Sequence, residues 1–99
     1  MAKKLAPMHP GEVLREEFLL PMDLTSYAVA KSCGVPRTRI ERIAREELGI
    51  SADTALRLGK FFRTSPDFWL NLQKDHDLLV ARKEIGKEVA KIEPVDAAA

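Results

Sequence analysis

Apolar residues recur every three or four positions along most of the chain, which is the spacing of amphipathic helices. Val13, Leu14 and Phe18, with Leu19 beside them, form the first such stripe. Ile40, Ile43 and Ala44 share one face of a later helix in the same way. No segment alternates apolar and polar residues as a half-buried strand does. The pattern therefore predicts an all-α domain.

Prolines, a glycine and hydroxyl side chains divide this pattern into five helices. Pro10 suits the first turn of the first helix, and Pro21 ends that helix. Gly34 ends the second helix, and Pro36 occupies the first turn of the third. Three hydroxyl side chains are placed to accept an unbonded N–H at the starts of the second, fourth and fifth helices: Thr25, Ser51 and Ser65.

The end of the chain continues the helical pattern before losing it. The fifth helix is expected to run as far as Ile85, and isoleucine and valine recur at helical spacing beyond it. We predict a flexible arm over residues 1–8, a helical domain over 9–82, and a helical extension with a disordered tail over 83–99.

Composition excludes several classes of protein. The chain has 99 residues and a formal net charge of +1, which suits one small domain and not a uniformly basic nucleic-acid binder. One cysteine and two separated histidines offer neither a disulfide nor a zinc site. No apolar run is long enough to span a membrane, and no signal peptide is evident. We expect a cytoplasmic protein that is not an enzyme and binds no metal, cofactor or small-molecule ligand.

Residues 26–45 have the spacing of a helix-turn-helix. Ala30 is small enough for close packing of two helices, and Gly34 allows the turn a positive φ. The apolar positions that would fill the shared core are Val29, Cys33, Val35, Ile40 and Ile43. In such a motif, the N-terminal part of the second helix enters the major groove of DNA.

Charge is segregated along the chain despite the low total. Residues 26–45 carry Lys31 and four arginines against Glu41 alone, which gives a local charge of +4. The alternative is a solvated face with ion pairs between Glu41 and Arg45 and between Arg42 and Glu46, each contributing about 0.2 to 0.5 kcal/mol. The segregation favours DNA binding over that alternative.

The outer face of the third helix supplies the candidate contacts to DNA. Arg37, Thr38 and Arg42 are the candidates for base edges, because an arginine can bond guanine O6 and N7 and a threonine can meet thymine. A second set of basic, hydroxyl and tyrosine side chains is expected to contact the phosphate backbone: Thr25, Ser26, Tyr27, Lys31, Arg39 and Arg45.

The acidic residues that offset this local positive charge lie largely in the first helix. Residues 12–23 have a net charge of −3, and their acidic residues include Glu12, Glu16 and Glu17. This surface either docks a basic partner protein or is simply solvated. Cys33 is expected to be a small buried residue, and Trp69 to lie either in the core or at a dimer interface.

Four segments together resemble the HigA antitoxins, also known as VapI-type proteins, within the XRE class of helix-turn-helix proteins. They read HPGEVLREEFLLPMDL, GVPRTRIERI, GISADTALRLGKFF and TSPDFWLNLQKDHDL. The resemblance implies a five-helix, lambda-repressor-like domain that binds double-stranded operator DNA as a homodimer and represses its own operon. It also implies a partner, a RelE-like HigB toxin that is a ribonuclease, for which the acidic first helix is the candidate contact.

The same resemblance carries roles to individual positions. It implies base contacts at Arg37, Thr38 and Arg42. It also implies a dimer built through the C-terminal helices, with four candidate residues: Trp69, Leu72, Leu78 and Leu79.

Two glutamates depart from the pattern of these proteins. Relatives often have a small or neutral polar residue at Glu41 and a glycine at Glu46. Because residues 46–48 are good helix formers, the third helix is expected to extend and stop at Gly49. Glu41 could accept from cytosine N4, pair with Arg45, or weaken DNA binding. Two other functions therefore stay open: an orphan regulator without a toxin, and an interaction module that has lost DNA binding.

Overall fold

The computed structural model describes residues 8–96, and within them it contains five helical segments and no strand. The first segment has two parts, α1 (Pro10–Val13) and a π-helical continuation, η1 (Leu14–Leu19). The others are α2 (Ser26–Cys33), α3 (Arg37–Ala44), α4 (Ala52–Phe62) and α5 (Pro66–Ala90). The predicted all-α class is confirmed.

The helices begin where the sequence places hydroxyl caps. Thr25 Oγ1 accepts from the N–H of Ala28 at 3.0 Å, and the Ser51 and Ser65 hydroxyls do the same at the starts of α4 and α5. His9 caps α1 differently, because its Nδ1 accepts from the N–H of Gly11 at 2.8 Å. Each cap satisfies a backbone donor that has no partner inside its helix.

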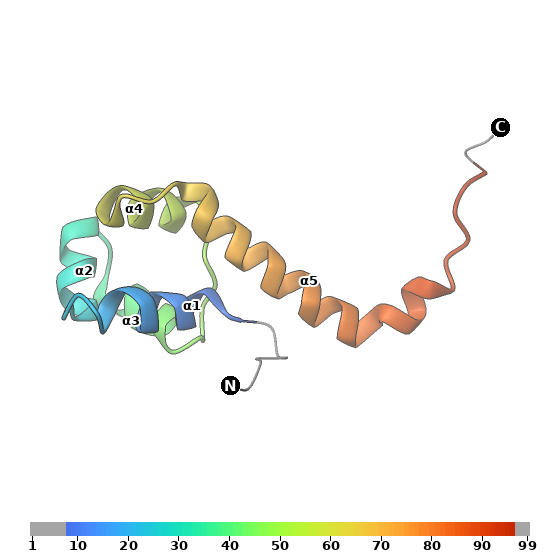
Figure 1. The fold of residues 1–99 in the computed structure, drawn as a ribbon, viewed down its shortest axis with the longest axis horizontal. Coiled ribbons are helices and arrows are strands. Elements are labelled where there is room, and N and C mark those ends of the chain that lie inside the picture. Colours follow the sequence, from blue (N-terminus) through green and yellow to red (C-terminus); the bar gives the residue numbers. More distant parts are fainter. Residues whose placement is uncertain (1–7, 97–99) are drawn as a thin grey trace.

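The core lies where α1 to α4 meet the first turns of α5 (Figure 1). Its largest member is Trp69, which is fully buried and donates from Nε1 to Thr64 Oγ1 at 2.9 Å. The rings of Phe18 and Phe62 pack beside it. Of the two roles left open for Trp69, the structure assigns the core. Its side chain therefore offers no surface to a second chain.

The first helix lies directly against the backbone of α3. A Cβ built on Gly11 would stand 1.7 Å from the carbonyl oxygen of Ile43, so only glycine fits at this contact. The approach brings α1 beside the C-terminal half of α3. It helps to fix the position of the helix whose outer face carries the candidate DNA contacts.

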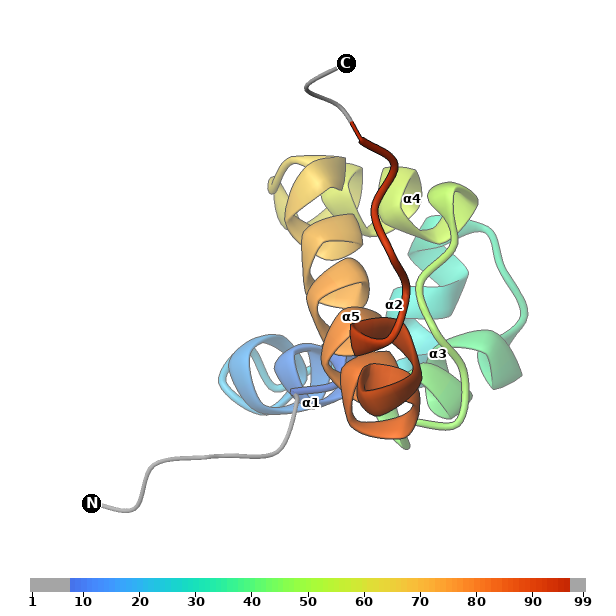
Figure 2. The same cartoon turned by 90° about the vertical axis from the view of Figure 1, so that its right-hand side faces the viewer.

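Helix α5 leaves the body of the domain and continues well beyond it (Figure 1). Viewed from its C-terminal end, the remaining helices are grouped around and behind its first half (Figure 2). It runs unbroken through the predicted boundary at residue 82 and past Ile85 to Ala90. Of the predicted arm over residues 1–8, residues 1–7 lie outside the described part of the chain. Within residues 8–96, no helix is long and apolar enough to cross a membrane.

Candidate nucleic-acid interface

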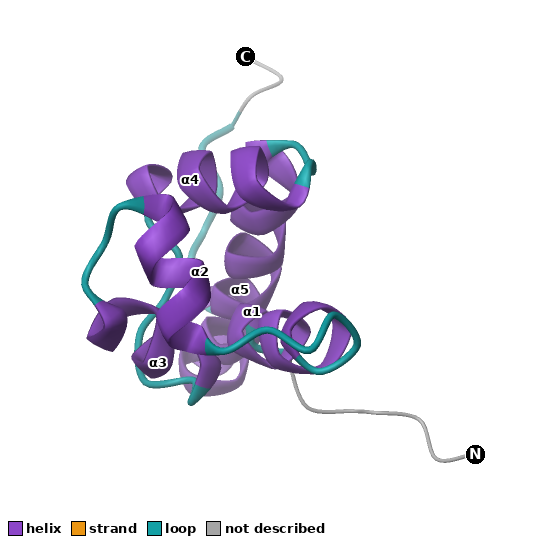
Figure 3. Cartoon of the chain, turned by 90° about the vertical axis from the view of Figure 1, so that its left-hand side faces the viewer, coloured by secondary structure: helices purple, strands orange, loops and turns teal. Residues whose placement is uncertain are grey.

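A short loop joins α2 to α3 (Figure 3), and Gly34, the C-cap residue of α2, is its first residue. Gly34 has φ 72° and ψ 36°, a left-handed conformation that glycine adopts without a steric penalty. The next residue, Val35, is hydrogen-bonded back to α2, because its N–H donates to the carbonyl of Ala30 at 3.0 Å. The turn thus closes the end of α2 and sends the chain into α3.

The two faces of α3 differ as its sequence predicts. Ile40 and Ile43 are buried in the core, with exposed fractions of 1% and 0%. The exposed side chains on the outer face are those of Arg37, Thr38, Arg42 and Arg45. The three candidate base-reading side chains therefore lie on solvent-exposed positions of one helix.

Neither of the two ion pairs expected of a solvated face, Glu41 with Arg45 and Arg42 with Glu46, forms within residues 8–96, but Glu41 makes a different pair on the same helix. Glu41 Oε2 lies 3.2 Å from Arg37 Nε and not beside Arg45. Arg45 is instead 3.8 Å from Glu47, and within residues 8–96 Arg42 has no ion-pair partner. Glu41 accordingly occupies one edge of the Arg37 guanidinium and leaves Arg42 unpaired.

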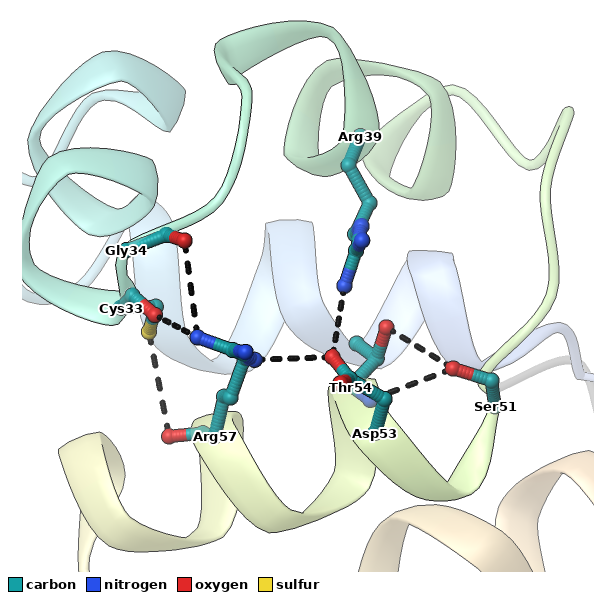
Figure 4. Close-up of polar contacts among 7 residues, drawn as sticks. All are labelled: Cys33, Gly34, Arg39, Ser51, Asp53, Thr54 and Arg57. Carbon is teal, nitrogen blue, oxygen red and sulfur yellow. Dashed lines mark hydrogen bonds and ion pairs between the residues drawn. The ribbon is translucent and has the colours of Figure 1, made fainter.

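Arg39 points toward another helix. Its Nη1 lies 2.8 Å from Asp53 Oδ1 in the first turn of α4, and the Arg39 side chain is only 33% exposed (Figure 4). Four of the remaining candidates for phosphate contacts lie on α2 or at its start, where Thr25, Tyr27 and Lys31 are exposed and Ser26 is half-buried. The fifth, Arg45, is exposed at the C-terminal end of α3. Their contacts to DNA stay predictions.

The third helix ends earlier than its sequence predicts. It stops at Ala44 instead of reaching Gly49, so the predicted extension is wrong. Glu46 adopts a left-handed conformation with φ 64°, which a helix cannot continue through. Arg15 holds this end, because its guanidinium donates to the carbonyl of Ala44 and lies 3.2 Å from Glu46 Oε2. Glu46 therefore faces η1 and not the outer face of α3.

The acidic residues of the first helix lie on α1 and η1. Glu16 pairs with Arg15 at 3.0 Å, Glu17 is exposed, and Glu12 is half-buried. This acidic surface includes the candidate toxin contacts. Its use as a docking surface stays a prediction.

Cys33, the one cysteine of the chain, is a poor candidate for a nucleophile. Cys33 is half-buried, and burial raises the pKa of its thiol, which disfavours the nucleophilic thiolate. No three histidine, cysteine or carboxylate side chains gather as a metal site in the described part of the chain. The surface of α3 is thus the feature with the clearest chemistry.

The fold and this surface define a helix-turn-helix protein of the DNA-binding class. No model of a known protein family matches the chain. It is 47% identical over 81 residues to virulence-associated protein I of Dichelobacter nodosus, which covers 82% of this chain and 75% of the relative. It is 34% identical over 92 residues to antitoxin HigA-1 of Vibrio cholerae, covering 93% and 87% of the two chains.

A solved structure agrees with these relatives. The Pseudomonas aeruginosa antitoxin HigA, determined with the higBA promoter, is 46% identical and superposes with a TM-score of 0.86 over 90% of this chain and 98% of its own. The chain belongs to the HigA antitoxin family. The predicted family is therefore confirmed, and with it the prediction that the chain is not an enzyme.

Proposed function

We propose that the chain binds operator DNA through the outer face of α3 and represses the operon that encodes it. The observation that carries this proposal is the exposed row of Arg37, Thr38 and Arg42 on a helix whose opposite face is fully buried. The Pseudomonas aeruginosa relative was solved with promoter DNA, which supports the same ligand here. Such a role places the protein in the cytoplasm.

The proposed side chains divide into those that contact base edges, which read the sequence, and those that contact phosphates. Arg42, which has no ion-pair partner within residues 8–96, is free to give a guanine two hydrogen bonds, worth about 1 to 3 kcal/mol of discrimination. Thr38, one turn before it, can meet a thymine methyl group. Arg45 and the exposed groups at the start of α2 contact phosphates, which sets the register of the protein without reading sequence.

The proposed functional form is a homodimer assembled through α5. Leu78, Ile85 and Val89 are between 44% and 50% exposed, and they follow one another at helical spacing along the projecting half of α5. A Cβ built on Gly86 would meet nothing within 4 Å, so a second helix can approach closely there. Of the four predicted interface residues, Leu78 and Leu79 are exposed, Leu72 packs against the core, and Trp69 is buried.

The second part of the proposed function is neutralisation of a HigB-like toxin. The acidic surface of α1 and η1 supports a basic protein partner by charge complementarity, with Glu16 and Glu17 as its most exposed carboxylates. Charge reversal at both positions is expected to reduce recovery of the toxin on co-purification. An unchanged yield would remove this surface from the proposal.

A gel-shift titration against the protein's own promoter tests the operator proposal. Binding that prefers this promoter over random DNA is the expected result, and equal affinity for both would leave only an interaction module. A gene for a small basic protein beside the operon separates the antitoxin from an orphan regulator. Its absence would favour the orphan regulator.

A further inference from the structure

A single carboxylate on α4, that of Asp53, accepts from one arginine of α3 and from one arginine of its own helix. Asp53 Oδ1 lies 2.8 Å from Arg39 Nη1 of α3 and 2.8 Å from Arg57 Nε of α4 (Figure 4). Both arginines therefore meet the same oxygen atom. Their hydrogen bonds, that of Arg57 first, hold the pKa of the Asp53 carboxyl below its ordinary value, so the link is charged at neutral pH.

Arg57 also contacts the C-terminal end of α2. Arg57 Nη1 donates to the carbonyl of Cys33 at 2.7 Å and approaches the carbonyl of Gly34 at 3.5 Å. These carbonyls belong to the C-terminal end of α2, where a positive charge is favoured by the helix dipole. Cys33 Sγ lies 3.8 Å from the carbonyl of Arg57, which adds a second contact between the same segments.

The start of α3 lacks the restraint that the other helices have. Pro36 is its N-cap residue, and no side chain caps it, whereas α2, α4 and α5 each have a hydroxyl cap. The first turn of α3 carries Arg37 and Thr38, two of the proposed readers. The ion pair between Arg39 and Asp53 is therefore a polar side-chain link from this turn to α4, in addition to the packing of Ile40 in the core.

We propose that Asp53 and Arg57 are positioning residues for DNA recognition, which fix the N-terminal turn of α3 relative to α2. This inference rests on the proposed function, because it assigns the two residues a part in operator binding. Neither needs to touch DNA. Asp53 fixes Arg39 from one side, and Arg57 joins that carboxylate to the carbonyls at the end of α2.

The link is open to solvent, and this separates positioning from stability. The side chains of Arg39, Asp53 and Arg57 are 33%, 54% and 42% exposed, and exposed ion pairs contribute little to the free energy of unfolding. Removal of Asp53 also makes the protein more positive, which by charge alone strengthens binding to any DNA. A loss of operator affinity in that variant would run against both trends.

The experiment measures gel-shift affinity of the full chain for its own promoter and for random DNA of the same length. Asp53→Asn and Arg57→Met are each expected to weaken promoter binding about tenfold while leaving affinity for random DNA within about twofold. Asp67→Asn removes an exposed first-turn carboxylate from α5, and Lys60→Met removes an exposed cation from α4, so these are the matched controls. Both controls should bind as the wild type does.

A folding control, a second variant at Arg57 and the salt dependence of binding complete the test. Circular dichroism at the temperature of the gel shift verifies that every variant is folded, and Arg57→Lys provides a second variant that keeps the charge but loses the planar fork. If Asp53 merely competes with phosphate for Arg39, Asp53→Asn would bind the promoter more tightly and raise the salt slope by about 0.9. That result, or wild-type affinity in both variants, would overturn the inference while leaving the proposed function intact. A wild type without preference for its promoter would overturn the proposed function first, and this inference with it.

Discussion

Arg15 and Glu46 join the first helix to the end of the third. Arg15 Nη2 lies 3.2 Å from Glu46 Oε2, and Arg15 Nη1 donates to the carbonyl of Ala44, the last residue of α3. This carbonyl has no partner inside the helix. Arg15 therefore secures the C-terminal end of α3, at the opposite end from the Arg39–Asp53 ion pair.

Loss of this contact should cost stability. Arg15→Ala is expected to lower the free energy of unfolding by about 1 to 2 kcal/mol, because a half-buried carbonyl loses a charged donor. Urea denaturation measures the change. Arg45→Ala is the control, since Arg45 is 61% exposed and its 3.8 Å ion pair with Glu47 should contribute less than about 0.5 kcal/mol. Equal effects of the two substitutions would contradict the assigned role of Arg15.

The backbone conformation at Glu46 predicts that glycine is more stabilising than alanine at this position, the reverse of their usual order in a helix. With φ 64°, this position is strained for any residue with a Cβ, so Glu46→Gly should be more stable than Glu46→Ala by about 1 kcal/mol. Both variants lose the ion pair with Arg15, which leaves the backbone as the difference between them. At Glu47, which is not in the left-handed region, glycine should be no better than alanine. Urea midpoints for the four variants give the comparison, and a more stable Glu46→Ala would refute it.

Local signals in the sequence were sufficient for most of the fold. The caps at Thr25, Ser51 and Ser65, the turn at Gly34 and the buried face of α3 follow from residue type and spacing, and the structure confirms them. The end of α3 does not follow from such signals. Helix propensity favours continuation through Glu46, whereas the structure ends the helix and places Arg15, distant in sequence, at this end.

In the candidate site, too, local sequence signals predict some features, whereas others depend on tertiary contacts. Periodicity identifies which side chains of α3 face outward, because that depends only on the helix repeat. It does not identify ion-pair partners, so periodicity alone neither separates Arg39 from the phosphate contacts nor excludes Arg45 as the partner of Glu41. In the structure, the partner of Arg39 comes from α4, and that of Glu41 lies one turn earlier on α3. Tertiary packing and rotamer choice decide both.

His9 predicts a dependence of stability on pH. Burial, followed by the neighbouring His76, lowers the pKa of His9, while Glu46 and Asp77 oppose the shift. The rings of His9 and His76 lie 4.9 Å apart, and His9 Nδ1 must be unprotonated to cap α1. The folded state therefore favours neutral His9. Its stabilising contribution is complete above the unfolded pKa of 6.5 and is lost as the pH falls through the lower folded value.

Replacement of His9 tests this dependence. His9→Asn keeps an N-cap acceptor but removes the titrating group, so stability should fall less between pH 7 and pH 5 than in the wild type. Urea midpoints at the two pH values measure the difference in slope. Parallel slopes for the two proteins would show that His9 does not contribute.

The exposed stripe on α5 predicts the oligomeric state. Ile85→Glu should convert the proposed homodimer to a monomer, because it places a charge in the middle of the apolar stripe. Sedimentation velocity gives the mass directly. Leu56 on α4 is a more exposed apolar residue outside the stripe, and Leu56→Glu should remain dimeric. A wild type that sediments as a monomer at micromolar concentration would contradict the proposed dimer.

A comparison of Arg42→Ala with Arg45→Ala determines whether the outer face of α3 reads operator sequence. The measurement is the gel-shift affinity of each variant for the protein's own promoter and for random DNA over a range of salt concentrations. Arg42→Ala should weaken promoter binding by about 1 to 3 kcal/mol and reduce the preference over random DNA. Arg45→Ala should weaken both DNAs alike and lower the salt slope by about 1. If both variants keep the full preference for the promoter, α3 does not read the operator, and the proposed role of its outer face is wrong.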